Sequence, residues 1–373
     1  MANSCPLVAL PTELLARIFE AYLPEYPRCV SMYPGTVDSP MFLAQICTRF
    51  KAVALATPSL WRAIDISAPH PSVPERLAPR RKATNTFLAR SASCALSLNM
   101  TGFPHQTYIH DLFDLLLPHR ERWEYLVLDA DAAILVQLAG PLPLLRGVEL
   151  SGFPHTPLAL PHYEAAPLHS LCVCRINIES IASPQSLTHI HLTRYAPAEC
   201  IPFLLRTPNL EFLSISLCRD SERALQPYPV ARSMKINLPA LHTLCLHTDD
   251  PIDTGPPESN LNFLDFLLVP SLRRLQVSSE HFHFPDRDRD PTAEARIRTF
   301  LTQWGIRSGR LEELRIFGIE FDDLDGSHEA PSSELMDRLR DVVHDYKPPS
   351  EKKENIRRQD WAVDALPFAL RFM

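Results

Sequence analysis

The sequence predicts an α/β repeat solenoid, with stacked parallel strands and helical or irregular returns, preceded by a small all-α module. Two observations indicate this fold class. An apolar L-x-x-L-x-L pattern recurs along most of the chain, and apolar residues at helical spacing fill the N-terminal segment before it. The 36 prolines and 10 glycines among 373 residues agree with both, because proline ends helices and favours many short elements.

The recurring apolar pattern indicates short strands whose alternate residues enter one core. Its registers begin at Trp61, Ser93, Trp123, Leu145, Leu168, Leu187, Leu210, Leu241, Leu272 and Leu311. The second apolar position of each register is Ile64, Leu96, Leu126, Val148, Leu171, Ile190, Leu213, Leu244, Leu275 and Leu314. Ser93 is the one start that is not apolar. We therefore expect parallel strands that bring these second positions side by side.

The segments between the registers carry the helical candidates. These are Tyr108–Leu117, Asp131–Leu138, Ala198–Leu205, Leu261–Leu268 and Thr292–Trp304. Beyond residue 320 the apolar pattern fades, and Pro331–Tyr346 predicts one more amphipathic helix before a charged tail that we expect to be mobile. The predicted organisation is a helical module at 1–62, the solenoid at 61–320, and the C-terminal helix with its tail at 321–373.

The N-terminal module is predicted to hold two helices. The first begins at an N-cap on Thr12 and ends before Pro24. The second follows a Ser39 cap, has Pro40 at its first position and continues to Leu55. Together they carry more apolar residues than so small a module can bury internally. We therefore expect part of the module's apolar surface to need a partner.

Three blocks of this module resemble the F-box family in their order and spacing. The blocks are Leu10-Pro11-x-Glu13-Leu14-Leu15-x-x-Ile18-Phe19, Ile46-Cys47-x-Arg49-Phe50 and Pro58-Ser59-Leu60-Trp61. The chain departs from the family at Phe50, where tryptophan is usual, and in the longer connection Pro24–Ser39. The resemblance implies docking to the small Skp adaptor of a cullin–RING ubiquitin ligase. The contact residues it implies are Leu10, Pro11, Leu14, Ile18 and Phe19.

The repeats resemble the irregular leucine-rich repeats that are attached to many F-box proteins, including those of fungi. Their spacing is uneven, and the Asn-or-Cys position of the regular repeat is matched only at Cys218. Together the two resemblances imply a non-catalytic substrate adaptor of an SCF-type (Skp–cullin–F-box) ubiquitin ligase, whose repeats bind a protein substrate. The alternatives are a repeat scaffold that acts with the Skp adaptor outside a ligase, and an enzyme with an unrecognised site in the solenoid.

The strand face opposite the core is the predicted substrate surface, because alternate residues of a strand point to opposite faces. The candidate residues on it are Asp129, Glu149, Cys172, His191, Ser214, Cys245, Gln276, Arg315 and Phe317. Acidic residues gather in the early repeats, whereas Arg315 stands in a late one. Such a face would suit a partner with one basic and one acidic end, with charge setting its orientation.

Composition argues against several other classes of partner. The net charge of −7 disfavours nucleic-acid binding, which needs a basic face. No apolar run is long enough to span a membrane. The 9 cysteines are odd in number and scattered, which favours reduced thiols in the cytoplasm or nucleus. We therefore expect protein partners, and neither a nucleic acid nor a membrane.

The sequence contains no recognisable catalytic or cofactor motif. It has no G-x-G pair, no G-x-S-x-G and no H-E-x-x-H. Four possible zinc ligands would gather on neighbouring strands, namely Cys172, Cys174, His189 and His191. However, alternate residues of one strand splay about 7 Å apart, which suits tetrahedral zinc poorly. The sequence therefore predicts no catalytic residue, no cofactor and no metal site.

Overall fold

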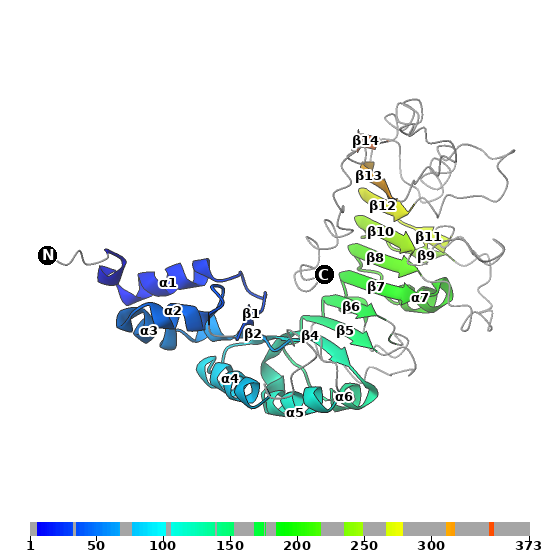
Figure 1. Ribbon diagram of the computed structural model, residues 1–373. Helices are drawn as coiled ribbons and strands as arrows, with labels where there is room; N and C mark the ends of the chain where they lie inside the picture. Colours follow the sequence, from blue (N-terminus) through cyan, green and yellow to red (C-terminus); the bar gives the residue numbers. More distant parts are fainter. Residues whose placement is uncertain are drawn as a thin grey trace, which may run out of the picture. The chain divides into compact units, whose positions relative to one another are not determined.

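The computed structural model describes residues 6–32, 35–67, 77–101, 106–138, 140–152, 168–174, 176, 184–217, 235–248, 266–278, 311–317 and 343–346. These residues belong to two compact units. Unit 1 contains the described residues up to Leu168, and unit 2 contains those from His169 onward. Figure 1 labels most of the α-helices and strands of both units.

Unit 1 begins with helices. They are the 3₁₀ turn η1 (Pro6–Ala9), α1 (Thr12–Tyr22), α2 (Pro40–Ile46), α3 (Thr48–Leu55) and the 3₁₀ turn η2 (Pro58–Trp61). The predicted start of α2 is confirmed: Pro40 is its first residue, and the Ser39 hydroxyl accepts a hydrogen bond from the Met41 amide at 3.3 Å. Thr12 is the first residue of α1 and not its cap, because Pro11 occupies the N-cap position.

The second predicted helix is divided into α2 and α3 at Cys47. This residue has extended backbone (φ −158, ψ 168), and its Sγ accepts a hydrogen bond from the Phe50 amide at 3.4 Å. A cysteine therefore takes the capping role that is usual for Ser or Asp. The prediction of one continuous helix to Leu55 is wrong because apolar periodicity alone does not reveal a cap inside it.

The strands of unit 1 follow one another in chain order and pair in parallel. They are β1 (Val30–Ser31), β2 (Ala63–Asp65), β3 (Leu96–Met100), β4 (Trp123–Ala130) and β5 (Gly147–Gly152). Between them lie α4 (Leu77–Arg90), α5 (Gln106–Leu116), the 3₁₀ turn η4 (Leu117–Arg122) and α6 (Ala132–Gln137). The structure confirms the helices predicted for α5 and α6, with small shifts at their ends. Strand β1 and helix α4 are additions that the patterns did not predict.

Unit 2 also consists of parallel strands, which Figure 1 shows as a ladder. The paired strands are β6 (Ser170–Cys174), β7 (His189–Tyr195), β8 (Phe212–Leu217), β10 (Thr243–Thr248), β12 (Arg274–Ser278), β13 (Leu311–Phe317) and β14 (Val343–Tyr346). A 3₁₀ turn η5 (Pro184–Ser186), helix α7 (Pro197–Leu204) and a small parallel pair of β9 (Ile236–Asn237) with β11 (Leu267–Leu268) lie between them in sequence. Helix α7 confirms the prediction at Ala198–Leu205.

The predicted registers describe how these strands align. In unit 2 the second apolar positions pair in one continuous row, formed by Leu171, Ile190, Leu213, Leu244, Leu275 and Leu314. In unit 1, Leu126 pairs with Val148 in the same way. The members of both rows whose side chains are described are buried. The chain is therefore an α/β protein in which parallel strands repeat along an aliphatic core.

The second repeat lies further along the chain than predicted. Ile64 pairs with Leu98 instead of Leu96, and the pairing of β3 with β4 has a register irregularity directly after Leu96. The start predicted at Ser93 is therefore wrong, and Ala95 takes that position. The sequence itself indicated this error, because Ser93 is polar where the other registers begin with an apolar residue.

Two predicted helices are strands where the structure describes them. Val343–Tyr346 is β14, which pairs with β13, although Pro331–Tyr346 was predicted to be helical. Likewise, the end of Leu261–Leu268 forms β11. In both places pairing with a neighbouring strand satisfies the backbone, and this tertiary gain outweighs local helical periodicity. Residues 261–265 and 331–342, together with Thr292–Trp304, lie outside the described residues.

Candidate functional site

Helix α1 has two apolar faces in different surroundings. Leu15 and Phe19 are buried, and the Phe19 ring packs edge-on against Phe50 of α3, with 5.0 Å between the ring centroids. Leu14 and Ile18 are 52 % and 41 % exposed. Because residues four apart lie on the same side of a helix, these two side chains form one exposed apolar stripe. Helix α1 therefore buries one face and leaves another apolar face open.

The open face coincides with most of the predicted adaptor contact. Pro11 is exposed and Leu10 is half-buried at the N-terminal end of the stripe. We call Leu10, Pro11, Leu14 and Ile18 the docking strip. Phe19 was also predicted to join this contact, but its side chain is buried in the core of the module, so it is not part of the exposed stripe.

Arg49 fixes the N-terminal end of the docking strip. Its Nη2 donates hydrogen bonds to Thr12 Oγ1 at 3.0 Å and to the Leu10 carbonyl oxygen at 3.5 Å. This arginine belongs to the second F-box-like block and lies near the α2–α3 break. The contact therefore ties the chain before α1 to α3 and orients the start of the strip.

Trp61 joins the helical module to the strands of unit 1. The indole is fully buried, and its Nε1 donates a hydrogen bond to the Ala54 carbonyl oxygen of α3 at 2.8 Å. Helix α4 also packs on the ring. The Phe87 ring lies edge-on at 5.0 Å, and the Arg90 guanidinium lies 4.3 Å from the ring centroid. Since β2 begins directly after Arg62, the helices and the first predicted register share one packed connection.

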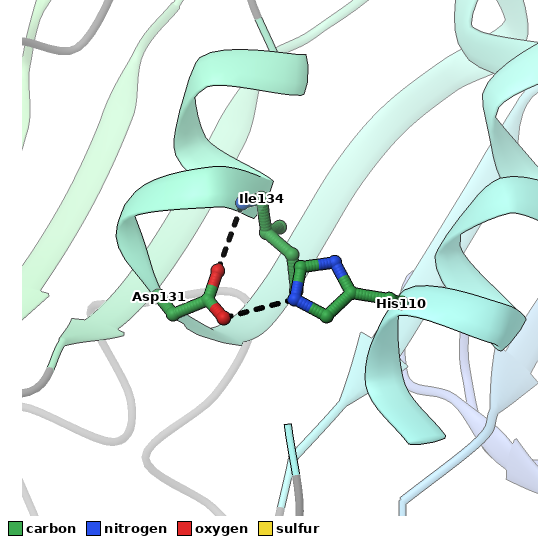
Figure 2. A network of polar contacts seen from close by, with 3 residues as sticks. All are labelled: His110, Asp131 and Ile134. Atoms are coloured by element: carbon green, nitrogen blue, oxygen red, sulfur yellow. Dashed lines mark hydrogen bonds and ion pairs between the residues drawn. The ribbon is translucent and has the colours of Figure 1, made fainter. Parts of the chain in front are cut away.

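A second polar connection holds α5 to α6. Asp131 caps α6, because its Oδ1 accepts a hydrogen bond from the Ile134 amide at 2.9 Å. Its Oδ2 lies 2.9 Å from His110 Nε2 on α5 (Figure 2). One carboxylate therefore serves as the cap of one helix and the partner of the helix before it. Sequence periodicity placed both helices but gave no indication of this contact.

Six residues of the predicted substrate face lie side by side in one row of unit 2. Ladder pairing brings together Cys172, His191, Ser214, Cys245, Gln276 and Arg315. The prediction that this face is open is wrong for Cys172, Ser214, Cys245 and Gln276, whose side chains are buried, whereas His191 is half-buried. Arg315 and Phe317 lie in β13, and their side chains are outside the described part of the structure. Alternation predicts which residues share a face but not how much of that face is covered.

Two hydroxyl groups on the same strand face are buried without a partner. Ser214 Oγ and Ser216 Oγ of β8 have no hydrogen-bond partner among the described residues. Next to them on β10, the ring of His247 lies 3.2 Å from Gln276 Nε2 of β12. The centre of the row is therefore polar, made of small side chains, and enclosed.

Only two of the four possible zinc ligands lie directly opposite each other on β6 and β7. Cys172 lies opposite His191, whereas Cys174 lies opposite Thr193 and His189 lies opposite Ser170. Among the residues that the structure describes, no three side chains of His, Cys, Asp or Glu are grouped to hold a metal ion.

The early acidic residues of the predicted face lie in unit 1. Glu149 of β5 is buried, and Asp129 of β4 is half-buried. Glu149 pairs with Val127, and Asp129 pairs with Ser151, so the two carboxylates are diagonal neighbours on one strand face. Burial, together with the charge of Asp129, raises the pKa of the Glu149 carboxyl to about 7.

No helix in the described ranges is long and apolar enough to cross a membrane. The cysteines that the structure describes are not in disulfide bonds; they are Cys29, Cys47, Cys94, Cys172, Cys174, Cys200 and Cys245. Compared with known proteins, the chain matches no protein-family model, and no curated protein matches its sequence.

Proposed function

We propose that the chain is a non-catalytic substrate adaptor of an SCF-type ubiquitin ligase. In this proposal the docking strip binds the Skp adaptor, which connects the chain to a cullin, and the strand repeats bind a protein substrate. The observation that carries it is the exposure of Leu14 and Ile18 beside the buried Leu15 and Phe19. An apolar stripe left open on a packed helix is typical of a surface that another protein covers.

The contacts around the strip add a second argument. The docking strip lies in the first of the three F-box-like blocks, Arg49 of the second block holds its start, and Trp61 of the third block is packed between α3 and α4. Each block thus has a separate physical role in presenting the same helix face. An adaptor that holds its substrate at a fixed distance from a ligase needs such a rigid base.

Capture by a purified Skp adaptor tests the docking strip. The double variant Leu14→Glu/Ile18→Glu should lower capture at least tenfold, because two carboxylates would have to be desolvated in the contact. Both side chains are exposed, so the far-UV circular dichroism should stay unchanged. Leu10→Ala/Pro11→Ala should weaken capture by removing the N-terminal end of the same contact.

Val136→Glu is the matched control. Val136 is 67 % exposed on α6, outside the docking strip, and the substitution adds the same kind of charge. Capture by this variant should equal that of the unchanged chain. Full capture by the Leu14→Glu/Ile18→Glu variant, or equal loss in the control, would contradict the proposed contact.

A second measurement separates a ligase subunit from a scaffold that uses the adaptor elsewhere. The adaptor-bound chain is incubated with a purified cullin–RING pair and then passed over a sizing column. Elution of all components together supports the ligase subunit. Adaptor binding without recruitment of the cullin would instead support the scaffold.

A further inference from the structure

Glu149 is a buried carboxylate that has no evident role in holding its strand in place. Its residue is 8 % exposed in β5, on the face opposite the buried pair Val148 and Leu150. Its Oε2 is buried and has no hydrogen-bond partner among the described residues. No lysine, arginine or histidine that the structure describes forms an ion pair with it.

The surroundings of Glu149 favour a cation. Asp129 is an acidic neighbour on that strand face, and its charge opposes the ionisation of Glu149. The residue directly opposite Glu149 on β4 is Val127, which is also buried and offers no hydrogen bond. A buried, unpaired carboxylate beside a second acid is costly, and one cation near both would offset that cost.

The strand face is partly exposed beside Glu149, on the side toward Asp129. Asp129 and its partner Ser151 are both half-buried, so this end of the pair contacts solvent. A long, flexible basic side chain can enter past such groups with its aliphatic stem against Val127 and its charged end at the carboxylates. A small inorganic cation would need more oxygen ligands than this arrangement provides.

We propose that Glu149 and Asp129 form a binding site for one lysine or arginine side chain of a protein partner. This inference rests on the proposed function in one respect: the basic side chain is taken to belong to the substrate that the repeats bind. The carboxylate of Glu149 accepts the charged hydrogen bond, and Asp129 attracts the cation toward it.

Fluorescein-labelled heptapeptides of glycine and serine with one central lysine, arginine or norleucine test the site. Binding to the full chain is followed by fluorescence anisotropy at pH 8 and low salt. We expect the lysine or the arginine peptide to bind at least tenfold more tightly than the norleucine peptide. Glu149→Gln should remove that difference, because it keeps the shape of the side chain and removes its charge.

Glu121→Gln is the control for a general loss of negative charge. Glu121 is exposed on η4 in the same unit, and this variant should bind all three peptides as the unchanged chain does. Equal affinity for the three peptides, or tighter binding of the basic ones that Glu149→Gln leaves intact, would overturn the site.

The failure of this site can be told apart from a failure of the proposed function. Capture by the Skp adaptor depends on the docking strip on α1, so Glu149→Gln should capture the adaptor fully. If the unchanged chain does not capture the adaptor, the proposed function fails whatever the peptides do. If capture is normal and the peptides show no charge preference, only the basic-residue site fails.

Discussion

The Tyr26 hydroxyl donates a hydrogen bond to Glu124 Oε2 at 2.8 Å, which joins the connection after α1 to the start of β4. The Arg62 guanidinium lies over the Tyr26 ring, 3.8 Å from its centroid, and the ring of Tyr125 meets it edge-on at 5.9 Å. Burial and the Glu124 carboxylate raise the pKa of Tyr26, so the phenol remains a proton donor. The unusually long connection between α1 and α2 is thus attached to the strands of unit 1.

Tyr26→Phe should lower the free energy of unfolding by about 1–2 kcal/mol. The change removes a hydrogen bond to a charged group and leaves the ring contacts in place. Urea denaturation followed by tryptophan fluorescence measures the loss. Tyr22→Phe is the matched control, because Tyr22 is 48 % exposed on α1 and its hydroxyl should contribute little. Equal stability of the two variants would count against the Tyr26–Glu124 bond.

Truncation of a side chain on the buried face of α1 should lower stability far more than truncation on its exposed face. Phe19→Ala should cost about 3–5 kcal/mol, because it leaves a cavity beside Phe50. Leu14→Ala should change stability by less than about 0.5 kcal/mol, because its side chain is exposed. Thermal denaturation of both variants checks this. A large loss in Leu14→Ala would mean that the docking strip is part of the core.

Asp131→Ala should destabilise α6 by about 1–2 kcal/mol, because it removes both the cap and the contact with His110 (Figure 2). Asp131→Asn should cost less, because the amide oxygen can still accept from the Ile134 amide. Hydrogen exchange of the α6 amides reports the effect locally. Equal protection in all three proteins would contradict the capping role.

Glu149→Gln should make the protein more stable at pH 8 but not at pH 4. The pKa of Glu149 rises from 4.5 to about 7 on folding, so its ionisation is less favourable in the folded chain. The folded protein therefore loses stability as the pH rises between these two values and keeps that loss above them. At about 1.4 kcal/mol per tenfold change in proton affinity, the difference at pH 8 is up to about 3 kcal/mol.

Chemical denaturation of both proteins at pH 4, 6 and 8 measures this difference. A stability gap that does not grow with pH would show that Glu149 ionises normally. A saturating basic peptide that binds the site should shrink the gap at pH 8, since it favours the ionised carboxylate of the unchanged chain.

Much of the strand architecture follows from the sequence because a buried strand position tolerates few residue types. The row from Leu171 to Leu314 could be aligned from the apolar pattern alone, since each of its members must be apolar. The same pattern gave the wrong register at β3. There the pairing with β4 shifts after Leu96, and a local sequence template does not include such an irregularity.

Other features depend on contacts that a local pattern does not describe. Helix α4 contains Arg80, Arg81 and Lys82 and lacks a clear apolar stripe, yet it packs through Phe87 against Trp61. Strand β14 pairs with β13, a contact that the local sequence does not contain. The exposure of Leu14 could be predicted from helical spacing and small module size. The burial of Glu149 could not be predicted, because the alternation of side chains shows which face a residue lies on but not whether other residues cover that face.

The one-to-one pairing of neighbouring strands also constrains how such a chain can change in evolution. A residue inserted within β8 would turn the side chains beyond it to the opposite face and place Ile215 where Ser216 now lies. An insertion between β8 and β10 leaves Leu213 opposite Leu244, because the ladder depends on the strands alone. The segments between strands can therefore change in length during evolution while the strand positions stay fixed. Such changes in length would produce the uneven spacing of the repeats.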